Sequence, residues 1–178
     1  WDSGNGYKVR LLLAHLGHDY RLVDLDIDHG GTHTPDFLAV NPNGKIPAIV
    51  LDDGRALFES NAIMLYLADG SPFMPQERFA RAQVAQWLFF EQYSHEPQVA
   101  VARYIHRHLP TGHTRYGELP ARLEGGRKAL GVMEQHLSKR DWMVGDAFSI
   151  ADIGLYAYTH VAHHGGFDLD EFPAVKAW

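Results

Sequence analysis

The chain has 178 residues, 46% of them hydrophobic and 21% charged, a composition typical of a globular protein with enough length for one core or two small ones. Its formal charge of −6, with no run of lysines or arginines, argues against nucleic-acid binding, because phosphate recognition needs a basic surface. No stretch approaches the roughly 18 uninterrupted apolar residues of a membrane span, and the absence of cysteine excludes disulfides and a protein thiol as nucleophile. Chemistry on a small molecule is therefore the favoured class of function.

The N-terminal segment predicts a helix close to the start of the chain. Apolar residues recur at helical spacing over residues 9–16, and Gly17 follows where a C-terminal cap is expected. A strand is expected to end at Trp1 or Asp2, directly before this helix, and we expect a chain that begins at Trp1 to have lost its original first residues. Residues 23–27 alternate apolar side chains with aspartates, which predicts a half-buried strand followed by a polar loop.

The next segment predicts a β-hairpin between two helices. A short helix is expected over residues 35–40. Residues 46–51 and 55–58 then flank the Asp53-Gly54 dipeptide, which is among the strongest short-range signals for a hairpin, and residues 61–68 return to helical spacing. The order helix, strand, helix, hairpin, helix is that of a small α/β unit.

The second half of the chain has no strand-like pattern. Residues 69–75 contain one glycine and two prolines, a composition typical of a linker. Residues 77–108 and 119–139 are long helical patterns, separated by a segment rich in glycine and proline. We therefore expect this half to be an all-helical bundle.

The segment FSIADI, residues 148–153, is the clearest local signature of the second half. Ser149 and Asp152 have the spacing of a capping box, in which each side chain accepts from the other residue's backbone N–H. Phe148 and Ile153 stand at the two positions of a hydrophobic staple, so one helix start is indicated twice. A role for Asp152 as a catalytic acid or base is the alternative, and the structural interpretation is favoured.

Histidine is abundant, with twelve in the chain. His160, His163 and His164 would share one helical face, but no carboxylate stands at a ligand-like spacing within that helix. Structural or surface roles are therefore favoured, and no metal site is predicted.

Four segments together resemble the cytosolic glutathione transferase family: SGNGYKVRLLL, NPNGKIPAI, ESNAIMLYLA and WMVGDAFSIADI. The resemblance covers nearly the whole chain. It implies an α/β thioredoxin-like N-terminal domain over residues 1–70 that lacks part of its first strand, followed by an all-α helical bundle domain over residues 76–178. It also implies a cytoplasmic homodimer that takes glutathione as co-substrate and a small hydrophobic electrophile as second substrate.

The resemblance gives Ser3 and Asn5 a catalytic role. Ser3 stands where serine-type classes such as theta and zeta carry the hydroxyl that donates to the glutathione sulfur and favours its thiolate, and Asn5 is a second candidate donor. Simple helix capping is the alternative for both residues, since serine and asparagine are favoured N-caps. Tyr7 is a further candidate, because other classes use a tyrosine, but it falls within the predicted helix.

The resemblance also implies a set of glutathione-binding residues. Ile46 and Pro47 would be joined by a cis peptide bond, with the Ile46 backbone pairing with the cysteinyl unit of the tripeptide. Lys45 would hold the glycyl carboxylate, while Ser60 and Glu59 would bind the γ-glutamyl carboxylate and amine. Without the family, these residues would be interpreted as a surface lysine, a proline at the entry of a strand and a serine N-cap.

The pocket for the electrophile is poorly indicated by the sequence. Trp87, Phe90, Tyr93 and Tyr104 are candidates, although aromatic residues at helical spacing more often belong to a core. Three functions remain open: a conjugating transferase, a disulfide-bond reductase that uses the thiols of bound glutathione, and a non-catalytic binding protein of the same family. The chemically intact tripeptide site disfavours the third.

Overall fold

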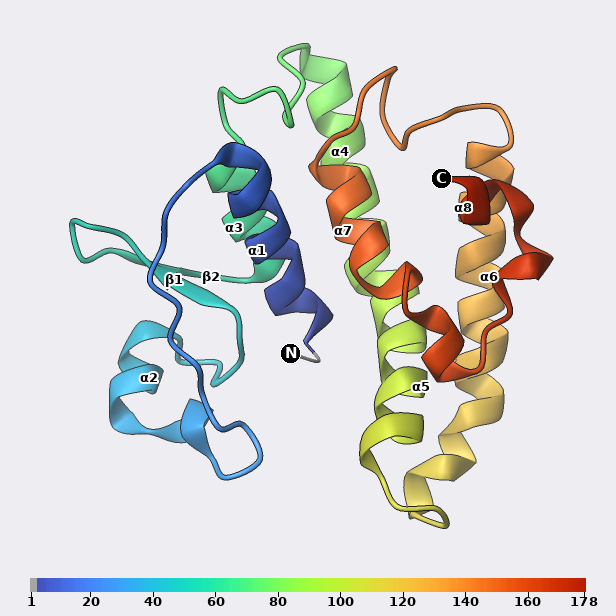
Figure 1. Ribbon diagram of the computed structural model, residues 1–178, viewed down its shortest axis with the longest axis horizontal. Helices are drawn as coiled ribbons and strands as arrows, with labels where there is room; N and C mark the ends of the chain where they lie inside the picture. The colour runs from blue at the N-terminus through green and yellow to red at the C-terminus, as the bar shows by residue number, and fades with distance from the viewer. Residues whose placement is uncertain (1–2) are drawn as a thin grey trace. The chain divides into compact units, whose positions relative to one another are not determined.

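The structure is a computed structural model and describes residues 3–178 (Figure 1). The chain divides into two compact units, the first ending at Pro72 and the second running from Phe73 to Trp178. The strand expected to end at Trp1 or Asp2 lies outside the described residues.

The first unit is built on two helices that pack against each other. Helix α1 spans Gly4–Leu16, and Gly17 ends it in the left-handed conformation, at φ 66°, as the sequence predicts. Helix α3 spans Ser60–Leu67 and lies beside α1 in Figure 1. The buried residues that join them are Val9, Leu13 and Ile63.

A β-hairpin completes this core. Strand β1, Ala48–Val50, pairs antiparallel with β2, Ala56–Phe58, and Ala48 stands opposite Phe58. Gly54 adopts φ +84° in the connecting turn, a conformation that suits the Asp-Gly signal of the sequence. Ile49 and Leu57 of the hairpin pack against the α1 and α3 core. The predicted hairpin and the short helix α2, Pro35–Val40, are confirmed.

The strand predicted over residues 23–27 is wrong. The structure assigns neither strand nor helix to this segment, and Val23 and Ile27 are exposed. A strand exists only where a neighbouring strand pairs with its backbone groups, and the sheet within residues 3–178 consists of β1 and β2 paired with each other. Alternating polarity indicates which face of a strand would be buried, but it does not supply the partner.

The second unit is helical, as the sequence predicts. The long pattern begins with α4, Arg78–Phe90, and ends with α5, Glu96–His108, with a π-helical turn at Glu91–His95 between them. The wider turn ends two residues before Pro97, whose ring would clash with the carbonyl four residues earlier in a regular α-helix. The chain therefore continues as one helix through this turn, as Figure 1 shows.

Three further helices complete the second unit. Helix α6, Leu119–Leu137, packs along α5, and α7, Ile150–Thr159, packs on α4 (Figure 1). The short helix α8, Pro173–Ala177, contacts α6. Single 3-10 turns connect these elements at Thr114–Glu118, Ala162–Gly165 and Leu169–Glu171, and another, Gly31–His33, precedes α2 in the first unit.

The capping box predicted for Ser149 and Asp152 is confirmed, and the Asp152 carboxylate also binds groups outside its own helix start. The capping box with Ser149 is present, and one Asp152 oxygen accepts from the Ser149 N–H and hydroxyl, both at 2.9 Å. The other oxygen accepts from the Met143 backbone N–H and the Trp178 indole N–H, also at 2.9 Å. With 0% of its surface exposed, this carboxylate joins the loop before α7 to the segment after α8.

Within residues 3–178, no helix combines the length and the apolar character that crossing a membrane requires.

Candidate functional site

The first part of the candidate site is the N-terminus of α1. Ser3 is its N-cap: the hydroxyl oxygen accepts from the Gly6 N–H at 3.2 Å, and the Ser3 carbonyl accepts from the Tyr7 N–H at 2.9 Å. A Cβ at position 6 would lie 3.7 Å from the Ser3 hydroxyl oxygen, so glycine there leaves this oxygen uncovered. The cap uses a lone pair of the hydroxyl, and its hydrogen remains suited to donation. Capping and donation to a sulfur are therefore compatible.

Asn5 and Lys8 extend the site along the first turns of α1. The Lys8 ammonium donates to Asn5 Oδ1 at 2.8 Å and to the Ser60 hydroxyl oxygen at 3.4 Å. The Ser60 hydroxyl in turn donates to Asn5 Oδ1 at 3.3 Å. Ser60 is the first residue of α3, so these bonds join the N-terminal ends of the two helices. Two sets of helix-terminal N–H groups thus meet at one place, with a lysine between them.

Glu59 directly precedes α3 and has an unusual backbone. Its φ of 68° is the single positive value recorded for a non-glycine among the described residues. Such a conformation costs on the order of 1 to 3 kcal/mol and persists only where the surrounding structure imposes it. Glu59 is exposed while Ser60 is buried. A strained backbone, an exposed carboxylate and a helix N-terminus therefore coincide at residues predicted to bind the γ-glutamyl end of glutathione.

The Ile46-Pro47 peptide bond is cis, as the sequence resemblance implies. The pairing of Ala48 with Phe58 places the residue before β1, Pro47, close to the residue after β2, Glu59. Lys45 is exposed, and its carbonyl accepts from the Asn41 amide at 2.6 Å, which anchors the segment that leads into β1. The predicted binding residues 45–47 and 59–60 thus flank one end of the hairpin.

Lys8 lies at the candidate site, and the sequence interpretation missed it. The signal that could have found it is its spacing of three from Asn5, which places the two side chains on one face of a helix. Its burial and its contact with Ser60 depend on the packing of α3, 52 residues further along the chain.

The four candidate aromatic residues do not form one group. Trp87 is buried and packs edge-on against Phe90, with ring centroids 5.3 Å apart, as expected for core residues. Tyr93 is exposed, whereas the Tyr104 ring stacks on His108 at 5.3 Å. No electrophile pocket is therefore assigned to these residues within the second unit.

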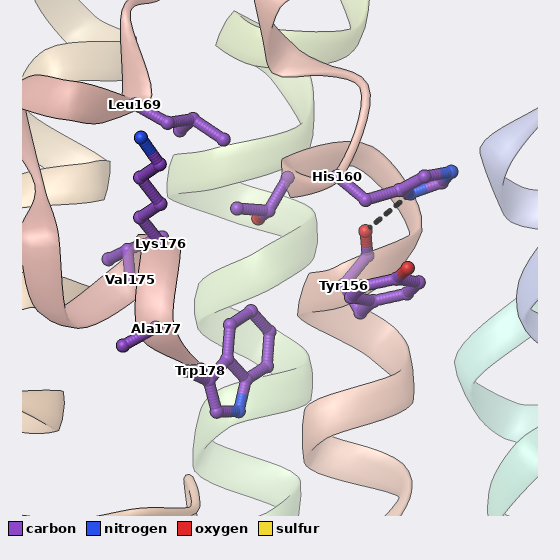
Figure 2. A pocket seen from close by; sticks show the side chains of 8 residues that line it. Tyr156, His160, Leu169, Val175, Lys176, Ala177 and Trp178 are labelled. Carbon is purple, nitrogen blue, oxygen red and sulfur yellow. Dashed lines mark hydrogen bonds between the residues drawn. The ribbon is translucent and has the colours of Figure 1, made fainter.

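A shallow pocket of about 230 Å³ does lie in the second unit (Figure 2). The Tyr156 and His160 rings stack there at 4.6 Å, and His160 Nδ1 bonds to the Tyr156 carbonyl at 2.9 Å. Its cation, Lys176, is paired with Asp170, and the Trp178 indole N–H is committed to a carboxylate outside the pocket. These groups are already occupied by internal contacts. In the part of the chain that the structure describes, no group of three potential metal ligands is found, at the histidines of this region or elsewhere.

Comparison with protein families matches both units. Residues 3–69 match the glutathione S-transferase N-terminal domain, and residues 93–178 match the glutathione S-transferase C-terminal domain.

Two solved structures are among the similar ones. A glutathione S-transferase from Pseudomonas fluorescens Pf-5 is 54% identical, with a TM-score of 0.97 over 99% of this chain and 88% of that one. A glutathione transferase from Burkholderia graminis, solved with two glutathione molecules bound per subunit, is 30% identical, with a TM-score of 0.87 over 99% of this chain and 78% of that one.

Two further relatives are not named as glutathione transferases. The disulfide-bond oxidoreductase YfcG of Escherichia coli K12 is 35% identical over 185 residues, covering 98% of this chain and 83% of YfcG. The transcriptional regulator URE2 of Saccharomyces cerevisiae is 30% identical over 218 residues, and the match covers 99% of this chain but only 61% of URE2. The fold is that of these proteins, with a thioredoxin-like first domain and a helical second domain, and the chain belongs to the glutathione S-transferase family.

Proposed function

We propose that the first unit binds glutathione and holds its sulfur as a thiolate that attacks a small hydrophobic electrophile. The observation that carries this proposal is the meeting of the α1 and α3 N-termini, joined by the hydrogen bond from Ser60 to Asn5. Helix N-termini favour anions, and glutathione brings two anionic groups to such a site, a thiolate and a carboxylate.

The chemical need is ionisation of the thiol. A free thiol has a pKa of about 8.5, so only a few per cent is thiolate at neutral pH. Lowering this pKa by ~2 units requires about 2.7 kcal/mol of preferential stabilisation of the anion. The Ser3 hydroxyl, the Asn5 amide and the N-terminal end of α1 are the groups that would supply it. The thiolate then forms the new carbon–sulfur bond as the electrophile's leaving group departs with the bonding electron pair.

The proposed pose places the tripeptide along one end of the hairpin. The cysteinyl unit pairs with the backbone of Ile46, beside the cis bond to Pro47. The γ-glutamyl carboxylate meets the Ser60 hydroxyl and N–H, its amine meets Glu59, and the glycyl carboxylate meets Lys45. The Ser60 hydroxyl donates to Asn5 over a long 3.3 Å bond, and it is free to rotate towards a bound carboxylate.

The first test is glutathione binding by wild type and Ser60→Ala, measured by titration calorimetry. A hydrogen bond to a charged group contributes ~1.5 to 3 kcal/mol, so we expect roughly a 10- to 150-fold loss of affinity in Ser60→Ala. Ser138→Ala removes an exposed hydroxyl of the second unit and should bind like wild type. No measurable binding by wild type, or equal binding by Ser60→Ala, would contradict the proposed site.

A disulfide-bond reductase is the second candidate, favoured by the similarity to YfcG and to a transferase that binds two glutathione molecules per subunit. Because the chain has no cysteine, two glutathione molecules would supply both electrons. One glutathione thiolate would attack the disulfide, forming a mixed disulfide and releasing one substrate thiol, and the second would attack the glutathione sulfur of the mixed disulfide, giving oxidised glutathione and releasing the other substrate thiol. The two activities are distinguished by assaying the protein with glutathione on aryl halides, epoxides and enones and, in parallel, on mixed disulfides. Binding without turnover of either kind would indicate a non-catalytic role.

We further propose that the chain forms a homodimer through one face of α4. Phe79, Phe89 and Tyr93 are 69%, 73% and 86% exposed, and helical spacing places them within one arc that continues into the π-helical turn. A second copy of the chain presents the same face, so one two-fold contact would cover the exposed aromatic residues of both copies.

Phe89→Glu is expected to dissociate this dimer, because a carboxylate would be buried at an apolar contact. Light scattering after size exclusion should give twice the 20.0 kDa chain mass for wild type and one chain mass for the variant. Val132→Glu changes an exposed apolar residue on α6 and should leave the mass at two chains. A monomeric wild type would contradict the proposed homodimer. A dimeric Phe89→Glu would mean that the interface lies elsewhere than on this face of α4.

A further inference from the structure

The Lys8 side chain is fully buried, with 0% of its surface exposed. It lies in the second turn of α1, beside the groups proposed to activate the thiol. An ammonium group out of contact with water is unfavourable unless its N–H groups find acceptors. Here it donates to Asn5 Oδ1 and to the Ser60 hydroxyl oxygen.

The hydrogen bonds at Asn5 determine which end of its side-chain amide faces Lys8 and Ser60. Asn5 Oδ1 accepts from the Lys8 ammonium at 2.8 Å and from the Ser60 hydroxyl at 3.3 Å. An ammonium can only donate, so it requires the carbonyl oxygen of the amide on its own side. The NH2 group of Asn5 is thereby turned away from Lys8 and Ser60.

This orientation matters for a bound thiolate. A thiolate is a hydrogen-bond acceptor, so it is stabilised by an amide NH2 group and destabilised by an amide oxygen in the same place. A hydroxyl can act either as donor or as acceptor, and a neutral partner such as Ser60 alone would tolerate both amide orientations. Lys8 tolerates only one.

We infer that Lys8 is a positioning residue for thiol activation, which holds the Asn5 amide with its oxygen towards Lys8, so that the NH2 group and not the oxygen is the end that would face the glutathione sulfur. The inference rests on the proposed glutathione site and adds a residue to it. Lys8 acts through Asn5, so its loss should alter the ionisation of the bound thiol and leave contacts with the rest of the tripeptide in place.

The test compares Lys8→Met and Lys8→Gln with wild type. Methionine fills a similar volume without donor or charge, so it removes both properties by which the ammonium acts on Asn5. Glutamine lacks the charge but can still donate to Asn5 Oδ1. Lys128→Met, which removes an exposed lysine on α6, is the matched control.

Two measurements separate positioning from binding: the thiol pKa of bound glutathione, from thiolate absorbance against pH, and the affinity for S-methylglutathione, which cannot ionise. In Lys8→Met we expect the bound thiol pKa to rise by about one unit, equal to roughly tenfold less thiolate, with S-methylglutathione affinity changed less than about threefold. Lys8→Gln should recover at least half of the pKa change. Lys128→Met should match wild type in both measurements.

Each contrary outcome has its own meaning. An unchanged thiol pKa in Lys8→Met, or a Lys8→Gln variant no better than Lys8→Met, overturns the positioning role while the glutathione site stands. A loss of S-methylglutathione affinity equal to the loss for glutathione also overturns it, because Lys8 would then act on binding alone. A wild type that binds neither ligand overturns the proposed function, and the inference with it.

Discussion

Ser3→Gly is expected to lower the conjugation rate at neutral pH by roughly 10- to 150-fold, with the rate recovering towards wild type as the pH is raised. A hydroxyl donates more strongly to a thiolate than to a thiol, and a hydrogen bond to a charged group contributes ~1.5 to 3 kcal/mol. Glycine retains most of the N-cap stability that alanine would lose, a few tenths of a kcal/mol against about 1 kcal/mol. The variant therefore removes the hydroxyl with little effect on α1, whose N-cap is this residue.

The controls for Ser3 separate capping from catalysis. Ser3→Thr keeps both the cap and the hydroxyl and should retain most of the rate. Asn5→Ala should lose less than Ser3→Gly, because the Ser3 hydroxyl and the helix N-terminus remain. The measurements are the pH profile of the rate and the thiolate absorbance of the glutathione complex. If the apparent pKa is unshifted in Ser3→Gly, or shifts more in Asn5→Ala, then Asn5 is the main partner of the thiolate and Ser3 is only a cap.

Among the variants proposed for this protein, Asp152→Ala is expected to produce the largest loss of stability. The buried carboxylate accepts four hydrogen bonds, from the Ser149 N–H and hydroxyl, the Met143 N–H and the Trp178 indole. Each buried donor left without a partner costs ~1 to 3 kcal/mol, so the free energy of unfolding should fall by ~3 to 5 kcal/mol. For a chain of this size, the melting temperature should fall by roughly 10 °C or more.

Two companion variants make the Asp152 result specific. Asp152→Asn keeps the volume and one acceptor oxygen but turns an NH2 group towards donors, so its melting temperature should lie between those of wild type and Asp152→Ala. Asp146→Ala removes an exposed carboxylate from the same loop and should stay within about 0.5 kcal/mol of wild type. Turnover of the folded fraction should be unchanged in all three. A large fall in turnover with normal melting would instead make Asp152 a catalytic group.

Several features of the fold could be predicted from the sequence because their causes are local. The C-terminal end of α1 follows from Gly17, which adopts the left-handed conformation that glycine permits. The hairpin follows from the Asp53-Gly54 dipeptide between two apolar runs. The capping box of Ser149 and Asp152 needs only residues three apart in the chain. In each case the interacting groups are close in sequence, so their spacing alone specifies the geometry.

Other features could be decided only by the tertiary structure. The segment 23–27 has the alternation of a strand, but a strand also needs a partner, and no pattern within the segment can provide one. Trp178 donates to Asp152 across 26 positions, and Lys8 meets Ser60 across 52. At the candidate site, the resemblance of the sequence to a family indicated Ser3, Asn5 and Ser60, whereas Lys8 was left unnoticed. A charged side chain acquires its role through what buries it, and that is set by the packing of distant segments.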